Sequence, residues 1–181
     1  MTTVQHATVI GATGIAAYTD TRFGKIPNVL TLPLIGFGVL LVFIAQGTDY
    51  ILDPILGIIG CGIVPAMMFN WRIGKDSKRA MYGGDVKLFA AIGSLAGLML
   101  GIEILFFSMS AAALGAIAVL IKRRRLLASL GNMFFLAFNR LLPEKKRRDV
   151  HAELQDPIRI GPFIFIGTIV AVVLRHPEWL G

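Results

Sequence analysis

The sequence predicts an all-α fold that crosses a membrane several times. Hydrophobic residues make up 55% of the 181 residues and charged residues only 16%, whereas roughly a quarter of a soluble domain is charged. The mean hydropathy is +0.72. Long apolar runs alternate with short polar loops, and only helices or closed barrels satisfy their backbone hydrogen bonds in lipid. We therefore expect a polytopic membrane protein of about six transmembrane helices, forming a single membrane-embedded domain over residues 1–181.

Six apolar runs have the length that a membrane-spanning helix requires. The predicted spans are residues 3–19, 27–46, 50–69, 85–100, 103–121 and 158–175. The first run is diluted by Gln5, His6 and several Thr and Gly residues. A cleaved signal peptide is the alternative for it, but such a signal needs a charged segment before the apolar stretch, and none is present. We therefore predict a span.

The later spans carry local signals. Pro27 opens the second span, which suits the first turn of a helix. Cys61 lies in an apolar stretch of the third span, as expected of a cysteine that packs in a core. Gly93, Gly97 and Gly101 recur at a four-residue spacing across the fourth span and its end. Such a repeat favours close helix approach, so we expect an architectural role for these glycines.

Residues 122–158 form the one long segment between predicted spans. Its middle, residues 126–142, is apolar and flanked by basic clusters. We predict a cytoplasmic loop with an interfacial helix that lies on the anionic inner leaflet. If residues 126–142 crossed the membrane instead, the basic cluster after Pro143 would be translocated, against the positive-inside rule.

Orientation follows from the distribution of Lys and Arg. Of the 18 basic residues, all but Arg175 fall in or beside the loops on one side. They are Arg22, Lys25, Arg72, Lys75, Lys78, Arg79, Lys87, Lys122, Arg123, Arg124, Arg125, Arg140, Lys145, Lys146, Arg147, Arg148 and Arg159. The positive-inside rule makes this side cytoplasmic and places both termini outside. The net charge of +7 is thus mainly a topology signal and secondarily a surface for anionic lipid. We expect no nucleic-acid binding, because no aromatic platform accompanies the charges.

Two aspartates stand out against this background. Asp20 ends the first span and Asp85 opens the fourth, so the predicted topology brings both to the cytoplasmic face. Taken singly, Asp85 could be a helix N-cap and Asp20 an interfacial charge beside Arg22. Two carboxylates on one face of a membrane protein instead favour a functional site with shared acid–base chemistry.

The segments around these aspartates resemble those of the type IV prepilin peptidases, a family of membrane aspartic peptidases. Residues 20–28 read Asp-Thr-Arg-Phe-Gly-Lys-Ile-Pro-Asn and are similar to the family's Asp-x5-Ile-Pro-Asn segment. Residues 83–88 resemble its Gly-x-Gly-Asp-x-Lys motif, and residues 159–163 its Gly-Pro turn before the last helix. The resemblance covers nearly the whole chain in the same order. It implies catalytic roles for Asp20 and Asp85.

The same resemblance implies supporting roles and a substrate. The supporting residues would be Pro27, Asn28, Gly83, Gly84 and Lys87. The implied substrate is a prepilin, with a basic leader followed by an apolar membrane helix, and the implied location is the bacterial inner (plasma) membrane. The chain lacks the Cys-x-x-Cys insert of the bifunctional methylating members. It is therefore similar to the short, peptidase-only enzymes of Flp/Tad pilus systems.

One position departs from the family motif. Tyr82 stands where the family has the first glycine of Gly-x-Gly-Asp. If that glycine provides backbone freedom before the helix, Gly83 could provide it one residue later. Tyr82 is the reason to consider a second hypothesis, a relative that binds pilin or assembly machinery without cutting. A third is a small proton-coupled transporter, which would place its acids deep within the spans.

The chemistry can be considered from the residue types themselves. The single cysteine and three scattered histidines show no metal-ligand spacing, so we expect neither a metal nor another cofactor. Without a nucleophilic Ser or Cys constellation, amide hydrolysis needs one carboxylate to activate water and a protonated one to polarise the carbonyl. Asp85 at a helix N-terminus and Asp20 at a helix C-terminus favour Asp85 as the base and Asp20 as the acid. Oligomeric state is left open.

Overall fold

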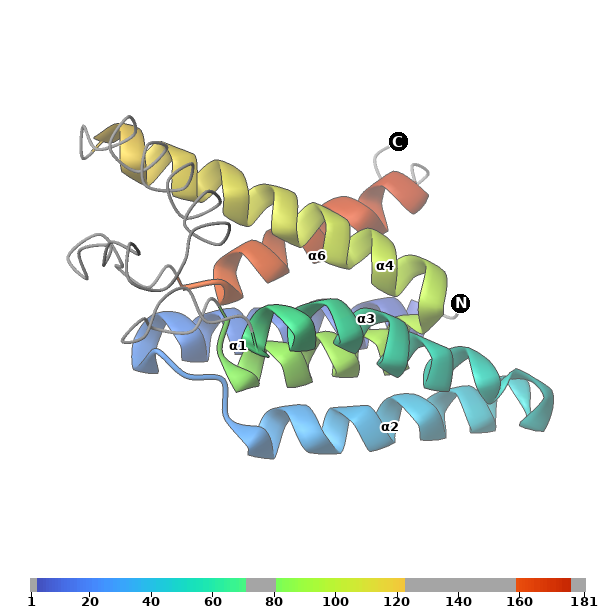
Figure 1. Cartoon of the computed structure of the whole chain (residues 1–181). Coiled ribbons are helices and arrows are strands. Elements are labelled where there is room, and N and C mark those ends of the chain that lie inside the picture. The colour runs from blue at the N-terminus through green and yellow to red at the C-terminus, as the bar shows by residue number, and fades with distance from the viewer. Residues whose placement is uncertain (1–2, 71–80, 123–158, 177–181) are drawn as a thin grey trace, which may run out of the picture.

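The computed structural model describes residues 3–70, 81–122 and 159–176, and the regular elements among them are all helices (Figure 1). In chain order they are α1 (Thr3–Phe23), α2 (Asn28–Gln46), the short 3₁₀ helix η1 (Thr48–Tyr50), α3 (Leu52–Asn70), α4 (Gly83–Lys122) and α6 (Gly161–Arg175). The predicted all-α fold class is thus confirmed for the described residues. The predicted interfacial helix over 126–142 lies outside them.

Most of the predicted spans coincide with long apolar helices. Within the described ranges, three helical segments are long and apolar enough to cross a membrane: α2, the Thr48–Phe69 segment of η1 and α3, and α4. The shorter α6 is also apolar, and α1 covers the first predicted span. The membrane character of the chain agrees with the prediction, and the count of six spans stays a prediction.

The 40-residue helix α4 consists of two arms joined at Gly97. The backbone of Gly97 has φ 71° and ψ −179°, a left-handed region that favours glycine. A Cβ on Gly101 would lie 3.3 Å from the Cα of Gly93, although an unbroken helix would separate these residues by about 12 Å. Figure 1 shows the second arm doubling back from the bend. The arms correspond to the predicted spans 85–100 and 103–121.

Asp53, in the first turn of α3, supports this bend. Its Oδ1 accepts a hydrogen bond from the backbone N–H of Leu98 at 3.1 Å. Leu98 begins the second arm, and the first N–H groups of a helix have no intrahelical acceptor. The Asp53 carboxylate also fills the space that a side chain at position 97 would need. The bend therefore depends on both the conformation of Gly97 and the carboxylate beside it.

The glycine repeat of α4 serves close packing, as predicted. Gly93 packs against the backbone of Gly57 in α3, and Gly101 packs against the sulfur of Cys61. Cys61 is fully buried. Close backbone approach strengthens van der Waals packing, which is a main source of helix association in lipid. This seam fixes α3 against both arms of α4.

The second arm of α4 packs on α6, and α6 packs on α1. Ser108 donates a hydrogen bond to the carbonyl of Ile164 at 3.4 Å, and Phe165 of α6 packs against Gly14 of α1. The C-terminal end of α1 and the starts of α2, α4 and α6 lie at one end of the bundle (Figure 1). At the other end the rings of His6 and His176 are 4.7 Å apart. This arrangement brings Asp20 and Asp85 to the same end.

We expect Gly97→Ala to destabilise the protein more than Asp53→Ala. The alanine would be forced into a backbone region that is essentially restricted to glycine, at about 1–3 kcal/mol, and its Cβ would collide with the Asp53 carboxylate. Asp53→Ala removes a helix-terminal hydrogen bond worth about 1 kcal/mol. Thermal unfolding in detergent measures both effects. Gly36→Ala is the matched control, because no atom lies within 4 Å of the added Cβ. A Gly97→Ala protein as stable as this control would contradict the role of the bend.

Candidate active site

Asp20 lies in the last turns of α1 and is almost fully buried, with 7% of its surface exposed. Its Oδ2 accepts a hydrogen bond from the backbone N–H of Gly161 at 2.9 Å. Gly161 is the first residue of α6, so this N–H belongs to the group that a helix leaves unpaired at its start. A buried carboxylate at a helix N-terminus is a favourable pairing. Asp20 thereby joins the end of α1 to the start of α6.

Gly161 permits this contact because it has no side chain. A Cβ at this position would lie 2.7 Å from the Cβ and 2.8 Å from the Oδ2 of Asp20, closer than side-chain atoms pack. Pro162 follows at the start of α6, where its missing N–H costs nothing. The Gly-Pro pair noted in the sequence therefore sets how closely α6 approaches Asp20.

Asp85 occupies the first turn of α4 and is 4% exposed. Its Oδ2 accepts a hydrogen bond from the backbone N–H of Tyr82 at 3.1 Å. The Tyr82 carbonyl in turn accepts from the N–H groups of Asp85 and Val86, at 3.1 and 3.4 Å. Tyr82 is therefore the N-cap, and Asp85 lies three residues into the helix and bonds back to it, as in a capping box. The interpretation of Asp85 as the N-cap residue itself was wrong.

Tyr82 supports Asp85 through its backbone. Any residue other than proline could donate the same bond, so replacing a glycine by tyrosine leaves this contact intact. The Tyr82 side chain is 51% exposed. Gly83 is not among the described glycines with positive φ, which are Gly24, Gly47 and Gly97. Gly83 therefore has a backbone conformation that does not itself require glycine.

The two carboxyl groups lie near enough to interact electrostatically. They come from different helices and are both buried at one end of the bundle. Two nearby carboxylates cannot easily both be charged, so such a pair tends to share a proton. The end of α1 and the start of α4 thus meet at one end of the bundle, as expected of antiparallel helix ends.

The predicted supporting residues connect the loop after α1 to the start of α4. Lys87 donates a hydrogen bond from Nζ to Oδ1 of Asn28 at 2.9 Å. A Cβ on Gly84 would lie 3.1 Å from both the Cβ and the carbonyl oxygen of Ile26, so Gly84 allows the loop to lie against α4 beside Asp85. Pro27 is the N-cap of α2, one residue before the predicted first-turn position. Gly83 makes only an ordinary contact.

Three contributors to this end of the bundle were not predicted as part of the site. The Arg159 guanidinium donates to the carbonyl of Thr21 in the last turn of α1, and a cation is favourable at a helix C-terminus. Gly24, with φ 67°, ends α1 in a left-handed conformation that glycine adopts without strain. The third contributor is the N–H of Gly161. The Gly-Pro motif was the one sequence signal that pointed toward that contact.

Helix polarity no longer separates the roles of the two carboxyl groups. Asp20 lies at the C-terminal end of α1 but also bonds to the N-terminus of α6, so the two partial charges oppose each other. Asp85 lies at the N-terminus of α4. Each aspartate thus accepts one backbone N–H at a helix start. The described residues include no group of three or more His, Cys, Asp or Glu side chains that could hold a metal.

Comparison with known proteins gives an independent result. The family model described as the type IV leader peptidase family matches residues 7–119, which include Asp20 and Asp85 but not α6. A prepilin peptidase, EppA of Methanothermobacter thermautotrophicus, is 40% identical over 86 residues, covering 44% of this chain and 20% of that protein. The chain thus matches about a fifth of that curated relative's length. No solved structure matches the chain.

We expect Gly161→Ala to break the contact between α1 and α6. The added methyl group must displace Asp20, and overpacking of this kind costs about 1–3 kcal/mol. The measurement is thermal unfolding in detergent, with Gly83→Ala as the matched control, because its Cβ would meet only Phe69 at 3.7 Å. Equal melting temperatures for the two variants would show that Asp20 does not depend on the close approach of α6.

Proposed function

Because the chain belongs to the type IV leader peptidase family, we propose that it is a membrane aspartic endopeptidase that removes the basic leader from prepilins. The observation that carries the proposal is the pair Asp20 and Asp85, two buried carboxyl groups from different helices at one end of an apolar bundle. Burial of unpaired acids is costly, and a protein retains such groups where their chemistry is used.

The contacts of the pair suggest how the reaction would proceed. A backbone N–H holds Oδ2 of each carboxyl group, which leaves the Oδ1 atoms for water and for the scissile carbonyl. One carboxylate accepts a proton from the attacking water, and the protonated partner donates to the carbonyl oxygen. The carboxyl group that took up the water proton then protonates the leaving nitrogen, and the other carboxylate takes back a hydroxyl proton from the tetrahedral intermediate as the C–N bond breaks. We assign these roles to the pair as a unit, because coupled carboxyl groups titrate together.

Lys87, Asn28, Gly84, Pro27 and Gly83 would act by positioning. The Lys87–Asn28 hydrogen bond and the close packing of Gly84 on Ile26 connect the loop after Asp20 to the helix that carries Asp85. Positioning of catalytic groups to within a fraction of an ångström is worth several orders of magnitude in rate.

The proposal extends to location and substrate. In this proposal the aspartate end lies at the cytoplasmic face of the plasma membrane and both termini lie outside, which the one-sided distribution of basic residues supports. A prepilin with a basic leader and an apolar helix would present its scissile bond at that face. The same proposal includes a single-domain organisation and contact with anionic lipid. It also includes processing of Flp/Tad-type pilins, which the missing Cys-x-x-Cys insert suggests.

The alternatives predict other arrangements. A proton-coupled transporter would hold its acids deep in the bilayer, whereas Asp20 and Asp85 lie at helix ends. The hypothesis of a non-cutting pilin binder rested on Tyr82, and the contact of Tyr82 with Asp85 is made by its backbone. Both points favour the peptidase.

Asp20→Asn and Asp85→Asn should each abolish leader removal. Neither amide can cycle a proton between water and substrate, so each loss should reach at least about a thousandfold, and the losses should not add in the double variant. The measurement is the mass of a co-expressed prepilin, with membrane content of the enzyme as the control for folding. Appreciable cleavage by either single variant would contradict the paired mechanism.

A reporter fused after Gly181 should register outside the cytoplasm, and one inserted near Lys145 should register inside. Both expectations follow from the asymmetry of Lys and Arg. Cysteines introduced next to Asp20 and next to Asp85 should both be labelled from the cytoplasmic side. If the two aspartates were labelled from opposite sides of the membrane, a shared active site would be impossible.

A further inference from the structure

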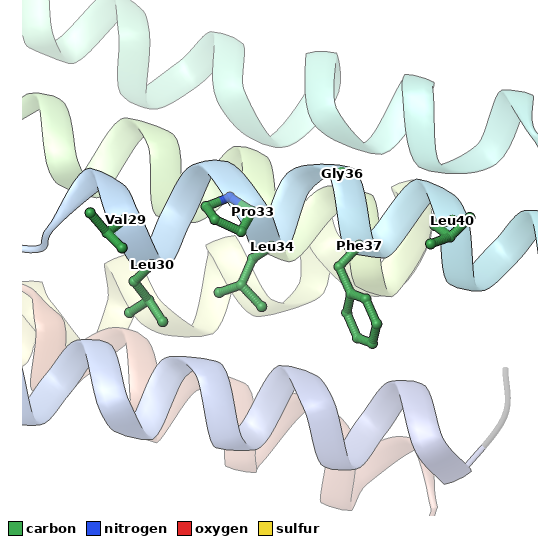
Figure 2. Close-up of a pocket in the computed structure, with 7 residues that line it drawn as sticks. All are labelled: Val29, Leu30, Pro33, Leu34, Gly36, Phe37 and Leu40. Carbon is green, nitrogen blue, oxygen red and sulfur yellow. The ribbon is translucent and has the colours of Figure 1, made fainter.

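An apolar groove of about 550 Å³ runs along α2, on the side of α2 that faces α1 (Figure 2). It is lined along α2 from Val29 to Leu40. Figure 2 shows the side chains of Leu30, Leu34 and Phe37 pointing from α2 toward α1 across the opening. The two helices make few contacts with each other, because α2 packs on α4 and α1 packs on α6. The hollow is therefore a product of the helix arrangement.

The groove leads to the candidate active site. Val29, at one end, directly follows Asn28, which is bonded to Lys87 two residues beyond Asp85. The side chains of Leu30 and Leu34 point toward α1 (Figure 2), whose last turns carry Asp20. The end of α1 and the starts of α2 and α4 lie at one end of the bundle (Figure 1), so Asp20, Asp85 and the Val29 end of the groove share that end.

We propose that this groove binds the first turns of the substrate's apolar membrane helix, the part that follows the scissile bond. The inference rests on the proposed function, since it names where the substrate of that site lies. The groove extends over 12 residues of α2, about 17 Å, slightly more than half of a hydrocarbon core of about 30 Å. It therefore runs from the membrane surface toward the midplane, as a helix entering from the cut end must.

The volume of the groove indicates how much of the substrate helix it can bind. A helix of this length and about 10 Å diameter would occupy about 1,300 Å³, more than twice the volume of the groove. The groove therefore takes one face of the helix, as in helix-in-groove recognition. The opposite face stays in lipid. The substrate can then enter sideways from the bilayer without unfolding the enzyme.

A proline in α2 suits the end of the groove where the scissile bond would lie. Pro33 lies inside α2 and lines the groove. Proline has no N–H, so the usual bond to the carbonyl four residues earlier, that of Val29, is missing. A peptide must be extended at its scissile bond, and its exposed N–H groups need acceptors in an apolar setting. Within the proposal, the Val29 carbonyl supplies one such acceptor.

Gly36→Phe tests the proposal by filling the groove. Position 36 lines the groove and has no atom within 4 Å of a built Cβ, so the fold has room for the ring. We expect the KM for a full-length prepilin to rise about tenfold or more, which corresponds to lost substrate binding. Ala113→Phe is the matched control, because Ala113 is exposed on the second arm of α4, away from α2 (Figure 1). An unchanged KM for Gly36→Phe would overturn the proposal.

Disulfide trapping gives a second readout that does not depend on catalysis. A prepilin with a cysteine in the third turn of its apolar helix should cross-link to Phe37→Cys in an Asp85→Asn background, and not to Ala113→Cys. The native Cys61 is fully buried and should not react. Equal cross-linking at Phe37→Cys and Ala113→Cys would mean that lipid, not substrate, occupies the groove. The absence of cross-linking at Phe37→Cys would mean the same if the wild-type enzyme cleaves the prepilin. Cross-linking at Phe37→Cys alone, with no cleavage by the wild type, would refute the peptidase but retain the groove as a pilin-binding surface.

Discussion

The structure depends on the need to bury two carboxyl groups at the end of an apolar bundle. A buried carboxylate requires hydrogen-bond donors, and in this bundle each one uses a backbone N–H at the start of a helix. For Asp85 the donor is local, three residues earlier. For Asp20 the donor is Gly161, distant in the chain, so the start of α6 must lie against the end of α1. The positions of α6, of the second arm of α4 that supports it, and of Arg159 follow from this requirement.

The main features of the fold and site could be predicted because lipid imposes simple rules. Apolar runs predicted the helices, and the charge asymmetry predicted which helix ends belong together. These two sequence patterns together predict that Asp20 and Asp85 lie at one end of the bundle. The four-residue glycine repeat predicted close helix packing, because small residues in a membrane helix indicate it, and the structure shows that the partner is α3.

What could not be predicted depends on contacts between distant residues. The hydrogen bond from Gly161 to Asp20 joins residues 141 apart in sequence, and it removes the helix-polarity argument that distinguished the acid from the base. The sharp bend at Gly97 requires the Asp53 carboxylate from another helix. The groove between α1 and α2 has no sequence signal, because its lining residues are as apolar as any lipid-facing surface. Its shape arises from which helices pack together.

The bend at Gly97 also determines the distance between the two aspartates. The first arm of α4 carries Asp85 and packs on α2 at Gly38, the second arm packs on α6, which holds Asp20 through Gly161, and α3 packs against both arms. The carboxyl groups therefore belong to two halves of the molecule that share Gly97 as their common vertex. Asp85 lies 12 residues from this vertex, a lever of about 18 Å. Each degree of change in the angle at Gly97 would shift one carboxyl group relative to the other by about 0.3 Å, so a bend far from the chemistry, held by Gly97, Asp53 and the packing of α3, sets the spacing on which proton sharing depends.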